Sequence, residues 1–403
     1  MQNDQSKMTK DTRTIAFGLT QSPTPSGPRY VDVTVSCPVF DSFRVQQVAG
    51  MFDVPLSQRM AERFRVEIPS GDDLWKIGLI VGPSGSGKTT IAREIFGDRL
   101  YRRAAWPEDR AVIDGLGDRP IKEITRLFTA VGFGSPPSWV KPYQVLSNGE
   151  QFRCDLARGL IEQGGRGKAE SGIPLPPSAF PLPAFPCLAF DEFTSVVDRN
   201  VARAVSAAVA RGIQQGQIGC RFVAVTCHYD VMEWLQPDWV IDMATRTFQR
   251  RCLRRPPVEL EIFRSDRSAW KLFARHHYLS GALNPTARCY LALWEGAAVA
   301  FCATLTLIGH KGRHRISRLV TLPDYQGLGI GMAVMEAVSD LHRSEGHRVN
   351  VTASHPAMIA HCRRSPRWRA VSVKKTGSAP SADFVHDYRT SAGRAVVSFE
   401  FTG

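Results

Sequence analysis

The sequence predicts an α/β protein of two domains, because it contains two glycine-rich turns that lie far apart. Each turn follows an apolar, strand-like run and precedes a run of helical period. The first turn spans residues 82–88 after a strand-like run over 76–81, and the second spans 326–331 after one over 316–322. A length of 403 residues also exceeds what one ordinary core holds, which supports a count of two.

Composition excludes several classes of protein. A hydrophobic content of 43% and a charged content of 22% fit a globular protein, and no run approaches the roughly 20 apolar residues that cross a bilayer. The N-terminus lacks the basic-then-apolar order of a signal peptide, so we expect a cytoplasmic protein whose nine cysteines stay reduced. The sequence contains no CxxC pair, so it does not predict a zinc ribbon.

The first turn has the residues of a loop that binds nucleoside triphosphates. Glycines let successive backbone N–H groups curl around phosphates, at the positive end of the helix that follows. Lys88 reaches the outer phosphates and the Thr89 hydroxyl is a magnesium ligand in such loops. The sequence therefore predicts an ATP and Mg²⁺ site, formed by Gly82, Ser84, Gly85, Ser86, Gly87, Lys88, Thr89 and Thr90.

Four further elements follow this turn in chain order. A Leu-Ser-Asn-Gly-Glu run over 146–150 heads a helical stretch, and an apolar strand over 187–190 ends in two acids. A Ser-Val-Val-Asp run over 195–198 comes next, and a second apolar strand ends at His228. With the first turn, this order resembles the nucleotide-binding domain of the ATP-binding-cassette (ABC) superfamily, over residues 55–245.

The resemblance implies a role for each element. Asp191 positions the magnesium shell, Glu192 polarises the attacking water, and His228 senses the terminal phosphate. Asp198 belongs to a loop that crosses a dimer axis. In this superfamily the segment with Ser147 and Gly149 contacts ATP held by the other subunit, so we expect a homodimer that closes on two ATP molecules.

Two departures from the family pattern argue against transport. Only 59 residues separate Lys88 from Ser147, which is short for the helical subdomain that docks onto membrane subunits. No glutamine lies where the usual glutamine loop falls, and Asp114 is a candidate for its place. We therefore predict no membrane partner. A Gly- and then Pro-rich run over 164–186 predicts an exposed, extended insertion, either a passive loop or a partner-binding segment.

The second turn begins a different kind of site. The strand, the Gln-Gly-Leu-Gly-Ile-Gly turn over 326–331 and the following helix resemble motif A of the GCN5-related N-acetyltransferases (GNAT), over residues 258–403. The resemblance implies that acetyl-CoA, or another acyl-CoA, binds backbone N–H groups of this turn and pairs with the preceding strand. The residues concerned are Val320, Leu322, Gln326, Gly327, Gly329 and Gly331.

The catalytic groups of the second domain are less clearly indicated. Many family members use a tyrosine on the helix after the fifth strand to protonate the departing thiolate, and here the corresponding run over 355–363 has none. His361 is the candidate there. His277 and Tyr278, on the helix that lines the acceptor side, are further candidates. For His277 a catalytic or metal-binding role and an ordinary surface role both stay open.

A net charge of +13 predicts a positive face that attracts a polyanion. Nucleic acid and the phosphates of coenzyme A are both open explanations. The basic residues cluster between the domains and in the second one: Arg246, Arg250, Arg251, Arg254, Arg255, Lys311, Arg313, Arg315, Arg318, Arg363, Arg364, Arg367, Arg369, Lys374 and Lys375.

The whole order of motifs resembles a prokaryotic and phage family in which an ABC-type ATPase is fused to an acetyltransferase domain. The second domain also resembles, through His277 and Tyr278, phage Mom-type proteins that modify adenine in DNA. We predict a P-loop ABC-type ATPase domain followed by a GNAT-fold mixed-sheet domain, acting on or near nucleic acid. The alternatives are an ATP-gated nucleic-acid clamp with a non-catalytic second domain and, less favoured, a transporter subunit. The predicted segments are an extension with edge strands over 1–54, the ATPase domain over 55–245, a basic linker over 246–257 and the transferase domain over 258–403.

Overall fold

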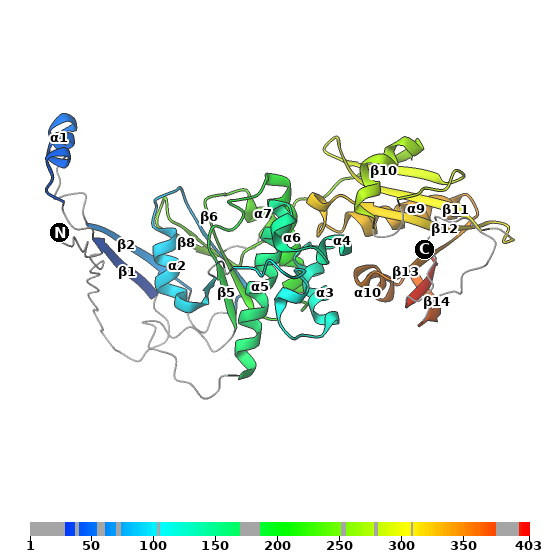
Figure 1. The fold of residues 1–403 in the computed structure, drawn as a ribbon, viewed down its shortest axis with the longest axis horizontal. Helices are drawn as coiled ribbons and strands as arrows, with labels where there is room; N and C mark the ends of the chain where they lie inside the picture. Colours follow the sequence, from blue (N-terminus) through cyan, green and yellow to red (C-terminus); the bar gives the residue numbers. More distant parts are fainter. Residues whose placement is uncertain are drawn as a thin grey trace, which may run out of the picture.

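The structure is a computed structural model that describes residues 29–36, 40–54, 61–69, 74–101, 103, 105–169, 186–250, 255–277, 281–307, 309–375 and 395–403. Two domains lie next to each other along the long axis of the molecule (Figure 1). The helices of the first domain that face the second are α3 (Ile121–Ala130), α4 (Pro136–Trp139) and α6 (Arg199–Gln214). No helix in the described segments has the length and apolar character needed to span a membrane.

The first domain is built on a six-stranded sheet in the order β4-β5-β6-β3-β7-β8. Its central strands β3 (Ile77–Val81), β5 (Cys187–Phe190) and β6 (Arg221–Thr226) are parallel and almost wholly buried, because helices cover both faces. Parallel strands end at one edge of the sheet, which brings the loops after β3, β5 and β6 together. The remaining elements of this sheet and its cover are β4 (Leu100–Tyr101), α2 (Lys88–Phe96), α5 (Asn148–Ala169), α7 (Val231–Leu235), β7 (Trp239–Asp242) and β8 (Thr247–Arg250).

The chain before β3 forms a separate two-stranded ribbon. Strand β1 (Arg29–Ser36) pairs antiparallel with β2 (Ala61–Ile68), and α1 (Phe43–Phe52), between them in the chain, has no buried residue. Phe64 of β2 packs against the first glycine-rich turn, so that a Cβ atom at Gly87 would lie 2.4 Å from its ring. The ribbon therefore supports the turn from outside the main sheet.

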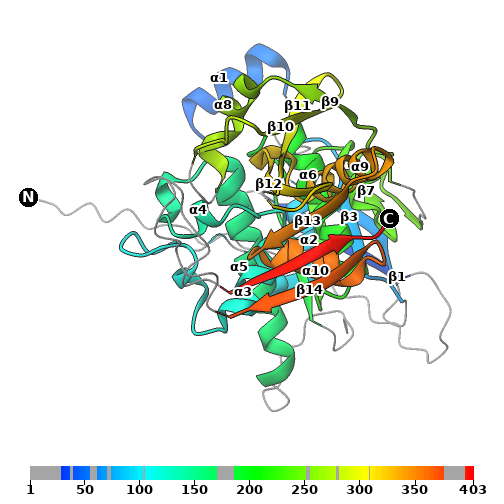
Figure 2. The same ribbon diagram turned by 90° about the vertical axis from the view of Figure 1, so that its right-hand side faces the viewer.

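The second domain is a seven-stranded mixed sheet in the order β14-β15-β13-β12-β11-β10-β9. Figure 2 turns this domain toward the viewer, with β13 and β14 across the front of the molecule. Two of its strands form a hairpin, in which Glu295 (φ +49°) and Gly296 (φ +77°) make the two-residue turn that antiparallel strands favour. The strands and helices are β9 (Glu261–Ser265), α8 (Trp270–Phe273), β10 (Arg288–Trp294), β11 (Ala297–Thr306), β12 (Arg313–Thr321), α9 (Ile330–Ser344), β13 (Arg348–Ala353), α10 (Pro356–Arg364), β14 (Trp368–Lys374) and β15 (Val396–Phe401).

Three local expectations differ from the structure. Helix α5 continues through the first residues of the predicted insertion, to Ala169, although glycine costs about 1 kcal/mol relative to alanine at each helical position. The Pro-rich remainder, 170–185, lies outside the described residues. Strand β8 lies in the predicted basic linker and pairs with β7, so that part of the linker belongs to the first sheet. The helix expected to carry His277 ends before it, because α8 spans only Trp270–Phe273 and a short 3-10 turn over Ala274–His276 follows.

The two domains share a hydrophobic core. Ala204 and Ala207 of α6 and Trp234 of α7 belong to the same buried cluster as residues of β10, β11 and α9. The rings of Trp234 and Trp294 meet edge to face with centroids 5.8 Å apart. Because the small side chains of α6 let the second domain approach closely, the domains form one continuous packed unit.

Candidate functional sites

The first glycine-rich turn is folded as an anion cradle at the start of α2. Gly85 (φ +78°) and Gly87 (φ +85°) have left-handed backbones that an L side chain rarely adopts. Lys88 Nζ donates to the carbonyl oxygen of Pro83 at 2.6 Å, so the lysine folds back over the turn. The buried Ser86 Oγ atom has no hydrogen-bond partner among the described residues. A curled row of N–H groups with a lysine above it fits the phosphates of a nucleotide.

The end of β5 places two carboxylates beside this turn. Thr89 Oγ1 donates to Asp191 Oδ1 at 3.2 Å, and the Glu192 N–H donates to the same oxygen at 2.9 Å. A hydroxyl and a carboxylate that meet at this distance are a fitting pair of protein ligands for Mg²⁺, whose other ligands are usually water and phosphate. The Glu192 backbone is left-handed (φ +51°), and the residue lines the cavity beside the turn.

A cavity of about 470 Å³ contains most of the predicted nucleotide residues. Gly82 and Ser86 do not line it, and in the described part of the chain His228 does not either. His228 Nδ1 lies 3.4 Å from Thr194 Oγ1, and burial lowers the pKa of the imidazole, so it is neutral at pH 7. The predicted residues in the cavity wall are Ser84, Gly85, Gly87, Lys88, Thr89, Thr90, Asp191 and Glu192.

Ser147, Gly149 and Asp198 lie apart from this cavity, at the starts of two helices. Ser147 and Glu150 form a reciprocal capping box, in which Glu150 Oε2 accepts from the Ser147 N–H at 3.0 Å. Asp198 Oδ1 caps α6 by accepting from the N–H groups of Asn200 and Val201 at 2.9 and 3.0 Å. None of the three lines the cavity of its own chain within the described residues.

The second glycine-rich turn leads into α9 at the boundary between the domains. Gly329 (φ +88°) precedes the first helical residue and offers no side chain to cap the helix, so the first N–H groups of α9 face outward. Strand β12 pairs with β13 only from Arg313 to Ile316. Beyond Ile316, the described residues show no ladder between these two strands, which leaves the β12 backbone open to an extended ligand.

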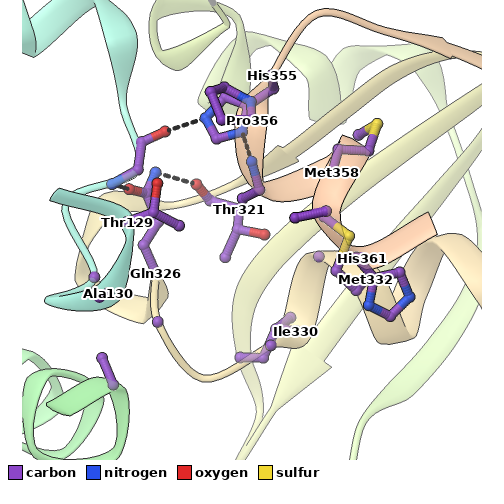
Figure 3. A pocket seen from close by; sticks show the side chains of 18 of the residues that line it. Thr129, Ala130, Thr321, Gln326, Ile330, Met332, His355, Pro356, Met358 and His361 are labelled. Carbon is purple, nitrogen blue, oxygen red and sulfur yellow. Dashed lines mark hydrogen bonds between the residues drawn. The ribbon is translucent and has the colours of Figure 1, made fainter. Parts of the chain in front are cut away.

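A cavity of about 450 Å³ lies over this turn and has walls from both domains (Figure 3). Five of the predicted coenzyme A residues line it: Val320, Gln326, Gly327, Gly329 and Gly331. Leu322 is not among the described lining residues, and its backbone N–H donates to Val299 in the neighbouring strand. His277 and His361 also line the cavity, whereas Tyr278 lies outside the described residues.

Gln326 links the turn to the first domain. Its Oε1 atom accepts from the Gly134 N–H at 2.9 Å, while its Nε2 atom donates to the Thr321 carbonyl at 3.1 Å (Figure 3). His355 completes the link, because its Nδ1 accepts from the Ala357 N–H and its Nε2 then donates to the Gly134 carbonyl at 3.1 Å. Sequence reasoning missed His355, which its position before Pro356 marks only as a helix cap.

The two candidate histidines are held in different ways. Burial lowers the pKa of His277 to about 4, and its ring meets Trp270 edge to face, so it is neutral at pH 7. His361 Nε2 lies 2.8 Å from Glu336 Oε1, which also accepts from Trp368 Nε1 at 3.2 Å. The structure therefore brings both histidines to the cavity and holds one of them against a carboxylate.

Comparison with known proteins agrees with the topology of the second domain. The model of the acetyltransferase (GNAT) family matches residues 229–363, a range that begins in the first domain and ends before β14. A search of curated proteins found no match to this sequence. The predicted α/β class is present in the structure, because a domain with a largely parallel sheet precedes a domain with a mixed sheet, and the GNAT family model matches most of the second domain.

Solved acetyltransferases and a solved ATP-binding cassette are each similar to part of the chain. The ribosomal-protein-S18-alanine N-acetyltransferase from Escherichia coli shares 16% identity over 36% of this chain and 93% of its own, with a TM-score of 0.28. The IAA acetyltransferase from Bacillus cereus shares 14% over 36% of this chain and 99% of its own, with a TM-score of 0.27. The dimeric ATP-binding cassette MJ0796, bound to ADP and Pi, shares 16% over 48% of this chain and 93% of its own, with a TM-score of 0.32.

Proposed function

We propose that this protein is an ATP-hydrolysing switch fused to an acyl-CoA-dependent acyltransferase. The observation that carries the proposal is the second cavity, because its walls come from both domains. A transferase that merely shared a chain with an ATPase would need no such common site. The shared cavity supports the view that nucleotide binding in one domain changes acyl-CoA binding in the other.

In the first domain, the residues divide the work of ATP hydrolysis. The N–H groups of the turn and Lys88 hold the phosphates, and Thr89 with Asp191 would hold Mg²⁺. The ion supplies positive charge that neutralises the developing charge on the phosphates. Glu192 orients the attacking water, and a neutral His228 donates or accepts a hydrogen bond near the terminal phosphate.

The separation of Ser147 and Gly149 from the chain's own nucleotide cavity supports a homodimer as the active form. Both residues lie at the exposed start of α5, where helix N–H groups are available to a partner's phosphates. In a two-fold dimer each chain would present this start to the ATP of the other. Closure would then bury two nucleotides between the subunits.

In the second domain, the turn at the start of α9 would bind the pyrophosphate of acyl-CoA, and the open edge of β12 would pair with its pantetheine arm. The acceptor nucleophile attacks the thioester carbonyl, and the C–S bond breaks as the new bond to the acyl carbon forms. The acceptor loses a proton and the thiolate gains one. Neutral His277 is one cavity residue able to transfer these protons, and His361 is a second candidate.

We propose nucleic acid as the acceptor class, on the basis of the net charge of +13. Several residues of the predicted basic surface instead make hydrogen bonds or ion pairs within the second domain. Arg318 is buried and donates to the Ser317 and Ala282 carbonyls, Arg369 pairs with Glu400, and Arg367 pairs with two acids of α9. Arg363 and Lys375 remain exposed. If DNA or RNA affinity stays constant between roughly 50 and 200 mM salt, this acceptor class is wrong.

A nucleic-acid clamp with a non-catalytic second domain is the second candidate. It is favoured by the hydrogen bond between His361 Nε2 and Glu336 Oε1 (2.8 Å), which occupies one candidate proton carrier. The absence of a tyrosine from α10 points the same way. Bound acyl-CoA without transfer to any acceptor would support this candidate.

Titration calorimetry with acetyl-CoA, with and without ATP and Mg²⁺, tests the main proposal. The blocked variant is Gly329→Trp, and Gly346→Trp is the matched control, because Gly346 is also left-handed (φ +81°) but adjoins open space at the other end of α9. We expect binding to the wild type and the control, with an affinity that ATP changes, and none to the blocked variant. No binding of acetyl-CoA in either nucleotide state would refute the transferase function.

A further inference from the structure

The first domain places an arginine against the start of α9. Arg211 lies in the last turn of α6 and lines the cavity between the domains. A Cβ atom built at Gly329 would lie 2.9 Å from Arg211 Nη1, so the guanidinium stands directly beside the turn. The uncapped N–H groups of α9 and the arginine therefore carry positive charge at the same place.

No acid in the described part of the chain neutralises this arginine. The side chain of Arg211 has no hydrogen bond or ion pair there, and its Nη2 atom is buried without a partner. Burial, with Arg255 and Arg364 nearby, lowers the pKa of Arg211 to about 10. A buried cation that faces further cations is costly unless an anion joins them.

Other arginines of the same helix show that the lack of a partner is specific to this position. Arg203 Nη1 lies 3.3 Å from Glu295 of the second domain, and Arg199 pairs with Asp230. Lys122 and Arg126 of α3 line the same cavity as Arg211, so the wall of the first domain is basic where the turn of the second domain is rich in N–H groups.

We propose that the first domain completes the acyl-CoA site in cis, with Arg211 as a direct ligand of a coenzyme A phosphate. The inference rests on the proposed acyl-CoA site and adds to it a binding residue from outside the GNAT fold. The phosphate would lie between the Arg211 guanidinium and the first N–H groups of α9, and both would donate to its oxygens. An acyl carrier without phosphates would make neither contact.

Calorimetric titration of Arg211→Gln with acetyl-CoA and with acetyl-pantetheine, which lacks the phosphates, tests this proposal. We expect acetyl-CoA to bind about 10- to 100-fold more weakly than to the wild type, and acetyl-pantetheine to bind equally to both. Arg203→Gln is the matched control, because it removes an exposed ion pair across the same boundary, and its affinities should stay within about threefold.

Arg211→Lys is a second variant in case Arg211→Gln fails to fold, because lysine keeps the positive charge but lacks the forked guanidinium. We expect its affinity for acetyl-CoA to lie between those of the wild type and Arg211→Gln. Unchanged acetyl-CoA affinity in Arg211→Gln overturns the inference and leaves the proposed function standing. An equal loss for both ligands also overturns it, because Arg211 would then act through domain packing. The inference is also overturned if the wild type binds acetyl-CoA no more tightly than acetyl-pantetheine. If the wild type binds neither ligand, the proposed function itself is overturned.

Discussion

Gly327→Ala is expected to separate the two domains locally. The Gly327 backbone is left-handed (φ +103°), and an added Cβ would lie 2.7 Å from Ala208 Cβ and 3.2 Å from the Ala204 carbonyl oxygen, both on α6. The left-handed backbone costs about 1–2 kcal/mol for a side chain, and the clash adds about 1–3 kcal/mol. The sum is a loss of about 2–5 kcal/mol of unfolding free energy, part of which the molecule can avoid by moving the turn away from α6.

Thermal or denaturant unfolding of Gly327→Ala and Gly346→Ala measures the two costs separately. Gly346 (φ +81°) is equally left-handed, but nothing lies within 4 Å of its added Cβ. The control should therefore lose only about 1–2 kcal/mol and bind acetyl-CoA normally. Gly327→Ala should lose more and also bind acetyl-CoA more weakly, because the turn shifts away from Arg211.

The same contact can be disturbed from the other side. A Cβ atom at Gly132 (φ +82°) would lie 2.8 Å from the Gln326 carbonyl oxygen, whereas one at Gly216 (φ +66°) meets nothing within 4 Å. Gly132→Ala should weaken acetyl-CoA binding although Gly132 belongs to the first domain. The result that refutes this contact is that each variant behaves like its control. If Gly327→Ala has the same stability and acetyl-CoA affinity as Gly346→Ala, and Gly132→Ala has the same as Gly216→Ala, the turn does not pack against the first domain in solution.

Three further changes have separate outcomes. Glu192→Gln should stop hydrolysis and trap an ATP-bound dimer in size-exclusion chromatography; a protein that stays monomeric with ATP contradicts dimer closure. Arg153→Met removes the buried bond from Arg153 Nη2 to the Pro323 carbonyl (3.0 Å) and should cost about 1–3 kcal/mol in unfolding experiments. Burial lowers the pKa of His342 to about 4, so the unfolded chain, with its value of 6.5, binds more protons between these pH values. Stability should fall by up to about 3 kcal/mol as pH drops from 7 to 4, and His342→Gln should flatten this profile.

Sequence patterns predicted what depends on neighbours in the chain. The strand, turn and helix around Lys88, and the hairpin at Glu295 and Gly296, follow from local period and turn chemistry. The two glycine-rich turns predicted an α/β chain of two domains. The predicted insertion began at Gly164, because glycine has a low helix propensity, whereas α5 runs to Ala169.

Contacts across the domain boundary were beyond sequence reasoning. Gln326 was assigned to coenzyme A, yet its side chain binds the backbone of Gly134, which is 192 residues away in the chain. Arg211 looked like one basic residue among many, and only the fold shows that its neighbours at the boundary leave it without an acid. No periodicity or spacing encodes such pairs, because they depend on how two finished domains meet.

Helix α6 runs from the expected dimer loop to the cavity between the domains, and so gives the coupling a physical path. It begins after Asp198, at the expected dimer loop, and carries Arg211 in its last turn, about 20 Å away at 1.5 Å per residue. Arg153 adds a second link from the start of α5, because its Nη1 donates to the Gly149 carbonyl at 3.3 Å and its Nη2 donates to the Pro323 carbonyl, before α9, at 3.0 Å. Because packed helices move as rigid bodies, displacement of either helix on ATP binding would shift the donors around the coenzyme A phosphates.

Coupling free energies are reciprocal, so the factor by which ATP changes acetyl-CoA affinity must equal the factor by which acetyl-CoA changes ATP affinity. Calorimetry in both orders, with Glu192→Gln to prevent turnover, measures the two factors; a factor of one in both would leave the shared boundary as packing alone.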